Sequence, residues 1–177
     1  MNPLRFSTLI LFAAGLPAFA QLPAGLRGDV IKELDAVEKK FVGLAQAMPQ
    51  EKYTWRPAEK VRSVSEVFVH IAGANFMIPA AIGIKPPAGL TRDMEKTITD
   101  KTQVVAKIQE SFAHLRKGVM DTPDSDLDKP IKLFGRDSTV RGALFIMSNH
   151  LHEHLGQSIA YARTNGVTPP WSMGGAE

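Results

Sequence analysis

The sequence of 177 residues contains no cysteine. Disulfide bonds, thiolate metal ligands and cysteine nucleophiles are therefore excluded, as is lipid attachment at a processing site. Aromatic residues make up only 7% of the chain, whereas the hydrophobic share of 44% and the charged share of 22% are ordinary for a globular protein. The length suits one domain with a full core better than two.

The sequence also lacks a block of basic residues. Its 21 Lys and Arg and its 18 Asp and Glu are scattered along the chain, and the net charge is +3. Binding to nucleic acid depends on clustered Lys and Arg that neutralise phosphates. We therefore expect no nucleic-acid partner.

The first residues differ in composition from the rest. The stretch MNPLRFSTLILFAAGLPAFAQ has one positive charge at Arg5, then an apolar run, and it closes with the small-x-small pattern Ala18-Phe19-Ala20 that signal peptidase reads. The run is short for a membrane span, which needs about 20 residues. We predict that residues 1–20 are a signal peptide and that residues 21–177 form one domain, periplasmic or secreted and free of the membrane once processed. An uncleaved membrane anchor is the alternative.

Four segments show helical periodicity. In the first, apolar residues recur every three or four positions until Pro49 ends the pattern: Val30, Leu34, Val37, Phe41, Leu44 and Met48. The second begins at a capping box, Ser63 and Glu66, and weakens at Pro79. The fourth spans 138–165 and ends in a glycine cap. The third carries a similar stripe of Ile98, Val105, Ile108, Phe112, Leu115 and Val119.

Four amphipathic helices bury their stripes most economically in a four-helix bundle, so we predict an all-α fold. The connections 50–62, 84–96 and 121–137 exceed the tight turns of a minimal bundle, and such connections often build a pocket. The sequence shows no strand-rich stretch. Because bundles with long exposed stripes often dimerise, a homodimer is left open.

The stretch SNHLHEHLGQ places histidines at alternate positions of the fourth segment. A helix advances about 100° per residue, so His154 lies about 40° and Gln157 about −20° from His150, on the face that carries Met147. His152 lies about 200° away and points outward. Only His150 and His154 therefore form a pair.

Two histidines at i and i+4 on an inward face suit a divalent transition metal, because both imidazoles can aim at one point. His70, followed by the small residues Gly73 and Ala74 in the second segment, is the candidate third ligand. His114 is expected on the flank or surface. The alternative is a set of hydrogen-bonded core histidines, but three neutral imidazoles without an ion would leave donors and acceptors poorly matched.

The same letters also contain H-x-x-E-H, the inverzincin pattern, in which Glu153 would be the general base. Proteases of that class are much larger and need a further acidic ligand downstream. Only Glu177 is available for that role, so this interpretation is disfavoured.

Two stretches resemble the DinB/YfiT-like metal-binding four-helix family: WRPAEKVRSVSEVFVHIAGANF and, further along, HLHEHLGQSIAYARTNGVTPP. The resemblance covers the chain from about Leu26 to Pro170. It implies that His70, His150 and His154 bind a divalent transition metal ion (Zn, Ni, Fe or Mn), with Gln157 lining the site or supporting a ligand. It also implies up-down-down-up connectivity of the bundle.

Three neutral imidazoles leave an ion's charge unneutralised and a position open, so a bound water would ionise at a pH of about 7, or a thiolate could bind. The resemblance implies either metal-dependent hydrolysis or thiol-dependent transfer or isomerisation. Because thiol cofactors are scarce outside the inner membrane, export favours a hydrolase acting on a small-molecule substrate. A thiol-dependent S-transferase and a non-catalytic metal-binding stress protein are the alternatives, and whether the chain is an enzyme is left open.

No catalytic residue is assigned. Glu153 could support a ligand or lie on a solvated flank, and Glu66 is expected to serve the capping box. A basic pocket built from Arg56 or Arg136 would favour the thiol-dependent alternative, and a site sealed by side chains would favour the non-catalytic one. Several connection residues could shape a pocket mouth, although packing across the loops is favoured: Tyr53, Trp55, Arg56, Phe134 and Arg136.

Overall fold

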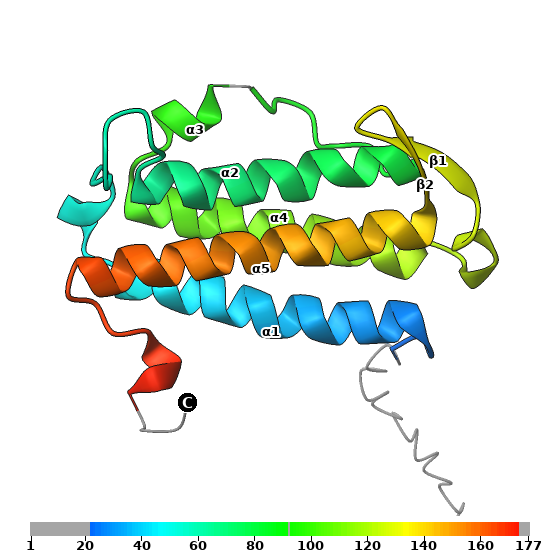
Figure 1. The fold of residues 1–177 in the computed structure, drawn as a ribbon, viewed down its shortest axis with the longest axis horizontal. Coiled ribbons are helices and arrows are strands. Elements are labelled where there is room, and N and C mark those ends of the chain that lie inside the picture. Colours follow the sequence, from blue (N-terminus) through cyan, green and yellow to red (C-terminus); the bar gives the residue numbers. More distant parts are fainter. Residues whose placement is uncertain (1–21, 92, 174–177) are drawn as a thin grey trace, which may run out of the picture.

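The computed structural model describes residues 22–91 and 93–173. The predicted signal peptide, residues 1–20, and Glu177 lie outside this range. Four long helices form the predicted all-α bundle (Figure 1): α1 (Leu26–Ala47), α2 (Val64–Met77), α4 (Lys101–Asp121) and α5 (Val140–Thr164). Shorter elements connect them: η1 (Gln50–Lys52), η2 (Ile78–Ile82), α3 (Met94–Thr97), η3 (Asp124–Asp126), β1 (Pro130–Leu133), β2 (Arg136–Thr139) and η4 (Pro170–Ser172).

Side-chain caps determine where three of these helices begin. At α2 the predicted capping box is present: Ser63 Oγ accepts a hydrogen bond from the Glu66 backbone at 3.3 Å, and Glu66 Oε2 accepts one from the Ser63 backbone at 2.7 Å. Asp100 accepts from the backbone of Gln103 at α4, and Thr139 caps α5 in the same way. Such caps satisfy amides that have no partner within the helix.

The predicted apolar stripes form one core. The apolar residues that follow one face of α1 from Leu34 to Met48 are each at most 2% exposed. In α4 the stripe includes Val104, which is fully buried, whereas Val105 is only partly buried. Helix α2 is buried around most of its circumference, because it packs against α4 and α5 and is covered by α3. By length and composition the segment Val64–Ile82 could cross a membrane, but 56% of it is buried inside the protein, as in the core helix of a bundle.

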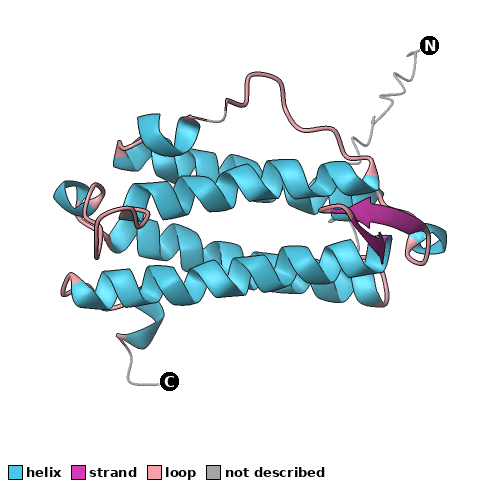
Figure 2. Cartoon of the chain, turned by 45° about the horizontal axis from the view of Figure 1, so that its top comes forward, coloured by secondary structure: helices cyan, strands magenta, loops and turns pink. Residues whose placement is uncertain are grey.

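The connectivity is up-down-down-up, as the family resemblance implies. Arg27 at the start of α1 bonds Asp124 just beyond α4, so these two helices are antiparallel. Tyr161 near the end of α5 donates to the backbone oxygen of Arg62, just before α2, so this pair is antiparallel too. Helices α2 and α4 run in the same direction. The chain must therefore return along the bundle between them, and the return segment, residues 83–100, carries α3 back over α2 (Figures 1 and 2).

The bundle also carries one small sheet, which no strand-rich stretch of the sequence indicated. Strands β1 and β2 form an antiparallel hairpin at one end of the bundle (Figure 2), with Pro130 opposite Thr139 and Leu133 opposite Arg136. Its two-residue loop is Phe134-Gly135, and both residues have positive φ, 51° and 77°. The strands escape pattern analysis because they are four residues each and mostly exposed, so no alternating apolar face marks them.

Candidate metal centre

The fold brings His70, from the middle of α2, against His150 and His154, from the middle of α5. One ring nitrogen of each lies within 4.8 Å of those of the other two. The ring centroids are 4.5 to 5.3 Å apart. The convergence inferred from helical geometry is therefore present, and this cluster could hold a metal ion.

Glu95, on the short helix α3, determines the orientation of His70. Its Oε1 lies 2.8 Å from His70 Nδ1, and its Oε2 accepts a hydrogen bond of 2.9 Å from Arg62 Nε. Burial by itself would raise the pKa of Glu95, but the hydrogen bonds from Arg62 and His70 outweigh it and lower the pKa. An ionised carboxylate only accepts hydrogen bonds, so Nδ1 of His70 carries the proton and Nε2 offers its lone pair.

A chain of hydrogen bonds orients His154 in the same way. Tyr161 Oη donates to the Arg62 backbone oxygen at 3.1 Å, so it accepts from Gln157 Nε2, also at 3.1 Å. This places the amide oxygen of Gln157 at 2.8 Å from His154 Nδ1. Since that oxygen can only accept, His154 Nδ1 carries the proton and its Nε2 is free to bind a cation.

Burial lowers the pKa of both His70 and His150 below the ordinary 6.5. For His150, the neighbouring rings of His154 and His70 and the charge of Arg62 act in the same direction as burial and bring the pKa to about 4. For His70, the hydrogen bond with Glu95 opposes burial without overcoming it. Both rings are therefore neutral at pH 7, which is the form that binds metals.

The donor set fits a divalent transition metal. The Nε2 atoms of His70 and His150 lie 3.3 Å apart. Two imidazole nitrogens bound at about 2.05 Å to one tetrahedral ion are separated by about the same distance. Glu95 and Gln157 supply the outer hydrogen bonds that metal-binding histidines usually have. That an ion binds here stays a prediction.

Two other histidines lie away from the cluster. His152 is exposed, as predicted, and its Nε2 lies 2.7 Å from Glu33 on α1. His114 lies on the flank of α4, half-buried against Phe76, with burial lowering its pKa.

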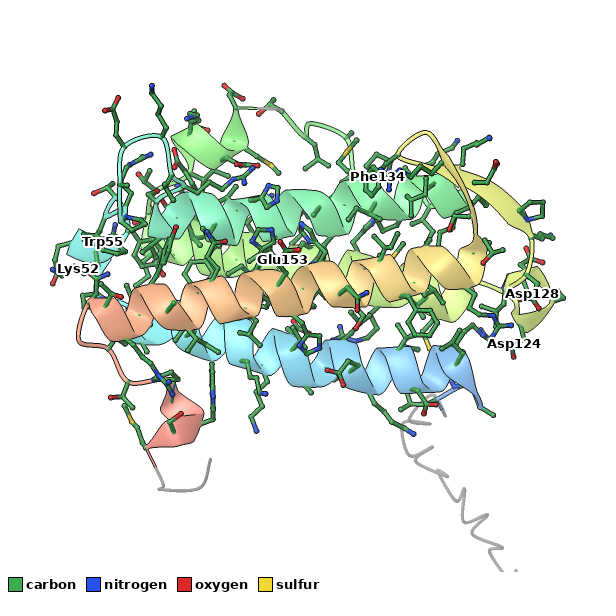
Figure 3. All side chains as sticks on the ribbon, viewed as in Figure 1. Lys52, Trp55, Asp124, Asp128, Phe134 and Glu153 are labelled. Carbon is green, nitrogen blue, oxygen red and sulfur yellow. The ribbon has the colours of Figure 1, made fainter. Side chains whose placement is uncertain are left out.

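Neither acidic candidate joins the cluster. Glu153 is exposed midway along α5 and makes no hydrogen bond or ion pair within the described residues (Figure 3). Glu66 serves the capping box. The residue that does contact a histidine of the cluster, Glu95, was missed. It lies in a connection without periodicity, and only the path of the return segment brings it to His70.

The connection residues divide between packing and pocket walls. Tyr53 is fully buried and donates to the Ala45 backbone oxygen, and Trp55 packs edge-on against Tyr161. Arg136 is exposed on the hairpin. Arg56 and Phe134 each line a pocket next to the cluster.

One of these pockets, the apolar cavity, measures about 560 Å³ and has His70 and His150 in its wall. The other, the cationic pocket, measures about 570 Å³ and contains Gln157. Glu95 belongs to both walls. The remaining wall of the apolar cavity includes Gly73, Ala74, Met77, Leu90, Met94 and Phe134, and that of the cationic pocket includes Arg56, Lys60, Arg62, Glu66 and Lys96.

The fold and this cluster define a small four-helix bundle protein with a candidate metal site. The sequence model of the DinB superfamily matches residues 33–158, which include all three histidines. The chain belongs to the DinB superfamily.

Individual relatives agree with this assignment. The uncharacterized protein YjoA of Bacillus subtilis (strain 168) is 28% identical over 127 residues, which are 71% of this chain and 81% of that protein. A DinB-like protein of Bacillus cereus ATCC 10987 superposes with a TM-score of 0.73 at 20% identity, covering 82% of this chain and 95% of that one. The crystal structure of YjoA superposes with a TM-score of 0.64 at 20% identity, covering 79% and 93%. At this identity the solved structures show a shared fold.

Proposed function

We propose that this protein is an exported metal-dependent hydrolase of a small molecule, in which His70, His150 and His154 hold a divalent transition metal ion. One observation carries the proposal. Two of the three imidazoles are held by Glu95 and Gln157 so that their Nε2 lone pairs face the cluster, and His70 and His150 border a cavity of about 560 Å³. Cavities of this size accept small organic molecules.

The cluster supplies three neutral ligands and no negative charge. A divalent cation held by these three residues would act as a Lewis acid and would lower the pKa of a bound water to about 7. Glu95 and Gln157 keep His70 and His154 in the tautomer that binds it. Leu90 of the return segment, Met94 of α3 and Phe134 of the hairpin form part of the cavity wall and would contact a bound small molecule.

Metal binding is tested first. We expect the purified protein to contain close to one equivalent of divalent metal by mass spectrometry, and His154→Ala to lose most of it. His152→Ala is the matched control, because the same helix and residue type are changed outside the cluster. A metal-free protein, or equal metal in both variants, would refute the metal centre.

Hydrolysis is tested on the metal-loaded protein with a panel of esters, amides and phosphoesters. Turnover must disappear in His154→Ala and stay in His152→Ala. Hydrolysis independent of the cluster would argue against the proposed mechanism.

A thiol-dependent S-transferase or isomerase is the second candidate. The cationic pocket favours it, because Arg56, Arg62 and Lys96 could bind the carboxylates of a low-molecular-weight thiol. Turnover that requires an added thiol would favour this candidate over the hydrolase. A non-catalytic metal-binding role fits less well, because side chains do not seal the histidines from the apolar cavity.

Export is the remaining part of the proposal and rests on residues 1–20. Sequencing the N-terminus of protein recovered from the periplasm of a Gram-negative host should give a chain beginning at Gln21. A full-length chain in the membrane fraction would favour the uncleaved anchor.

A further inference from the structure

We infer that the site takes an amphipathic organic anion, whose apolar group occupies the apolar cavity beside the histidines and whose negatively charged group occupies the cationic pocket. Because this names the substrate class of the proposed hydrolase, it rests on the proposed function. Binding is measured without turnover, so the two can fail separately.

The apolar cavity selects for an uncharged, apolar group. After His70, helix α2 contributes the small residues Gly73 and Ala74 and then Met77 to the cavity wall, and α3 contributes Met94. A Cβ at position 73 would lie 2.7 Å from Met94 Cε, so the end of the Met94 side chain lies directly against Gly73. Met77 and Phe134 are 56% and 72% exposed. A bound apolar group would cover these side chains and remove them from water.

The cationic pocket has an excess of positive charge. Its lining carries four basic side chains and two carboxylates, and both carboxylates are already engaged. Glu66 accepts from the Ser63 backbone and pairs with Arg56 at 3.2 Å and Lys96 at 3.5 Å. Lys60 makes no ion pair within the described part of the chain. An anionic group would therefore meet uncompensated positive charge.

The two pockets meet at one ion pair. Glu95 and Arg62 are joined by the 2.9 Å hydrogen bond, and Glu95 borders both pockets while Arg62 borders the cationic one. Arg62 is linked to the cluster through Glu95, whose other carboxylate oxygen lies 2.8 Å from His70 Nδ1. A ligand whose apolar end lies beside the histidines thus has its charged end near the cations. In a hydrolase, this would place a scissile ester or amide bond at the cluster, between an apolar acyl group and an anionic leaving group.

The wall of each pocket contains one non-glycine residue with a strained backbone conformation. Within the described residues, the non-glycine residues with positive φ are Lys60, at 66°, and Phe134, at 51°. Bulky side chains rarely adopt this conformation, and it tends to persist where function requires it. One strained residue faces each pocket.

The test uses octanoate, 1-octanol and acetate, which separate the two parts of the ligand. Calorimetric titration should show octanoate binding about tenfold tighter than either other probe, in the protein as isolated and after chelation of metal. If octanoate and 1-octanol bind equally tightly, the apolar cavity alone explains the affinity. If octanoate and acetate bind equally tightly, the cationic pocket alone explains it. Either result would overturn the inference. Octanoate binding only in the presence of metal would also overturn it, since the carboxylate would then be a metal ligand. If the protein binds octanoate but hydrolyses none of the esters, amides and phosphoesters of the panel, the proposed function is refuted and the inference stands.

Two variants assign the two ends of the ligand. Ala74→Phe, which fills the apolar cavity, should weaken octanoate and 1-octanol about tenfold, whereas Ala160→Phe on the exposed face of α5 should not. The double variant Lys60→Gln/Lys96→Gln should weaken octanoate about fivefold and leave 1-octanol unchanged. Lys32→Gln/Lys39→Gln on α1 makes the same change in charge outside the pocket and is its control. Unchanged octanoate affinity in either pocket variant, with folding verified by circular dichroism, would overturn the inference.

Phe134 gives a test in which stability and binding move in opposite directions. Its two-residue loop, with positive φ at both positions, favours Asn-Gly. Phe134→Asn should therefore raise the urea midpoint of unfolding while weakening octanoate and 1-octanol alike. If binding is unchanged in this variant, the hairpin does not form part of the ligand site.

Discussion

Glu95 Oε1 lies 2.8 Å from Nδ1 of His70, although the two residues belong to different elements and Glu95 is carried by a connection. The contact links the return segment to the cluster. A carboxylate that accepts from a ligating imidazole fixes its tautomer and increases its basicity.

Loss of this carboxylate should weaken metal binding. We expect Glu95→Gln to lower the affinity for a divalent metal by about 10-fold to 100-fold, because the amide holds His70 less firmly. Glu153→Gln removes an exposed carboxylate from α5 and is the control, because it should leave the affinity for the metal unchanged. Competition with a chromophoric chelator measures the metal affinity of each variant. Equal affinities would mean that Glu95 does not position His70.

Substitutions of Gln157 test the tautomer of His154 directly. Gln157→Glu keeps an acceptor facing Nδ1 and adds negative charge, so metal affinity should equal or exceed that of the wild type. Gln157→Leu removes the acceptor and should weaken binding by about tenfold. The same chelator competition applies. Weaker binding in Gln157→Glu than in Gln157→Leu would show that Nδ1, and not Nε2, of His154 faces the ion.

The capping box predicts a pH-dependent stability. Burial would raise the pKa of Glu66, but the Ser63 backbone and the charges of Arg56 and Lys96 outweigh it and lower the pKa below 4.5. A lowered pKa means that the stabilisation is present above about pH 4.5 and is lost as the pH falls through the folded-state pKa. Glu66→Gln should therefore cost about 1 kcal/mol at pH 7 and progressively less below pH 4.5.

Urea unfolding at several pH values measures this difference. Glu59→Gln changes an exposed carboxylate in the same connection and is the control. Its difference in unfolding free energy from the wild type should not depend on pH. A cost of Glu66→Gln that stays constant down to pH 3 would contradict the ionised capping box.

Gly118 anchors the beginning of the return segment. A Cβ at this position of α4 would lie 2.3 Å from Ile84 Cδ1, with Cγ1 and Cγ2 at 3.1 and 3.2 Å, so Gly118→Ala should destabilise the protein by about 1–3 kcal/mol. In an Ile84→Ala background the clash is absent, and Gly118→Ala should become neutral or stabilising. Gly156→Ala on α5 meets nothing within 4 Å and should stabilise by about 0.5–1 kcal/mol. Additive effects of Ile84→Ala and Gly118→Ala would refute the contact.

Much of this protein follows from local patterns. The spacing of apolar residues, the capping box at Ser63 and the stop at Pro49 determine where the helices lie and which faces are buried, because a helix face depends only on a periodicity of 3.6 residues. For the same reason, the sequence alone places His150 and His154 on one face and His152 on the other.

What the tertiary structure decided is the environment of those histidines. Glu95, Arg62 and Phe134 lie in connections, whose conformation depends on long-range packing and leaves no periodic signal. The parallel direction of α2 and α4 forces the chain to return along α2, and this return brings Glu95 to His70 and separates the apolar cavity from the cationic pocket. Periodicity determined the faces of the helices, and the path between the helices determined what those faces meet.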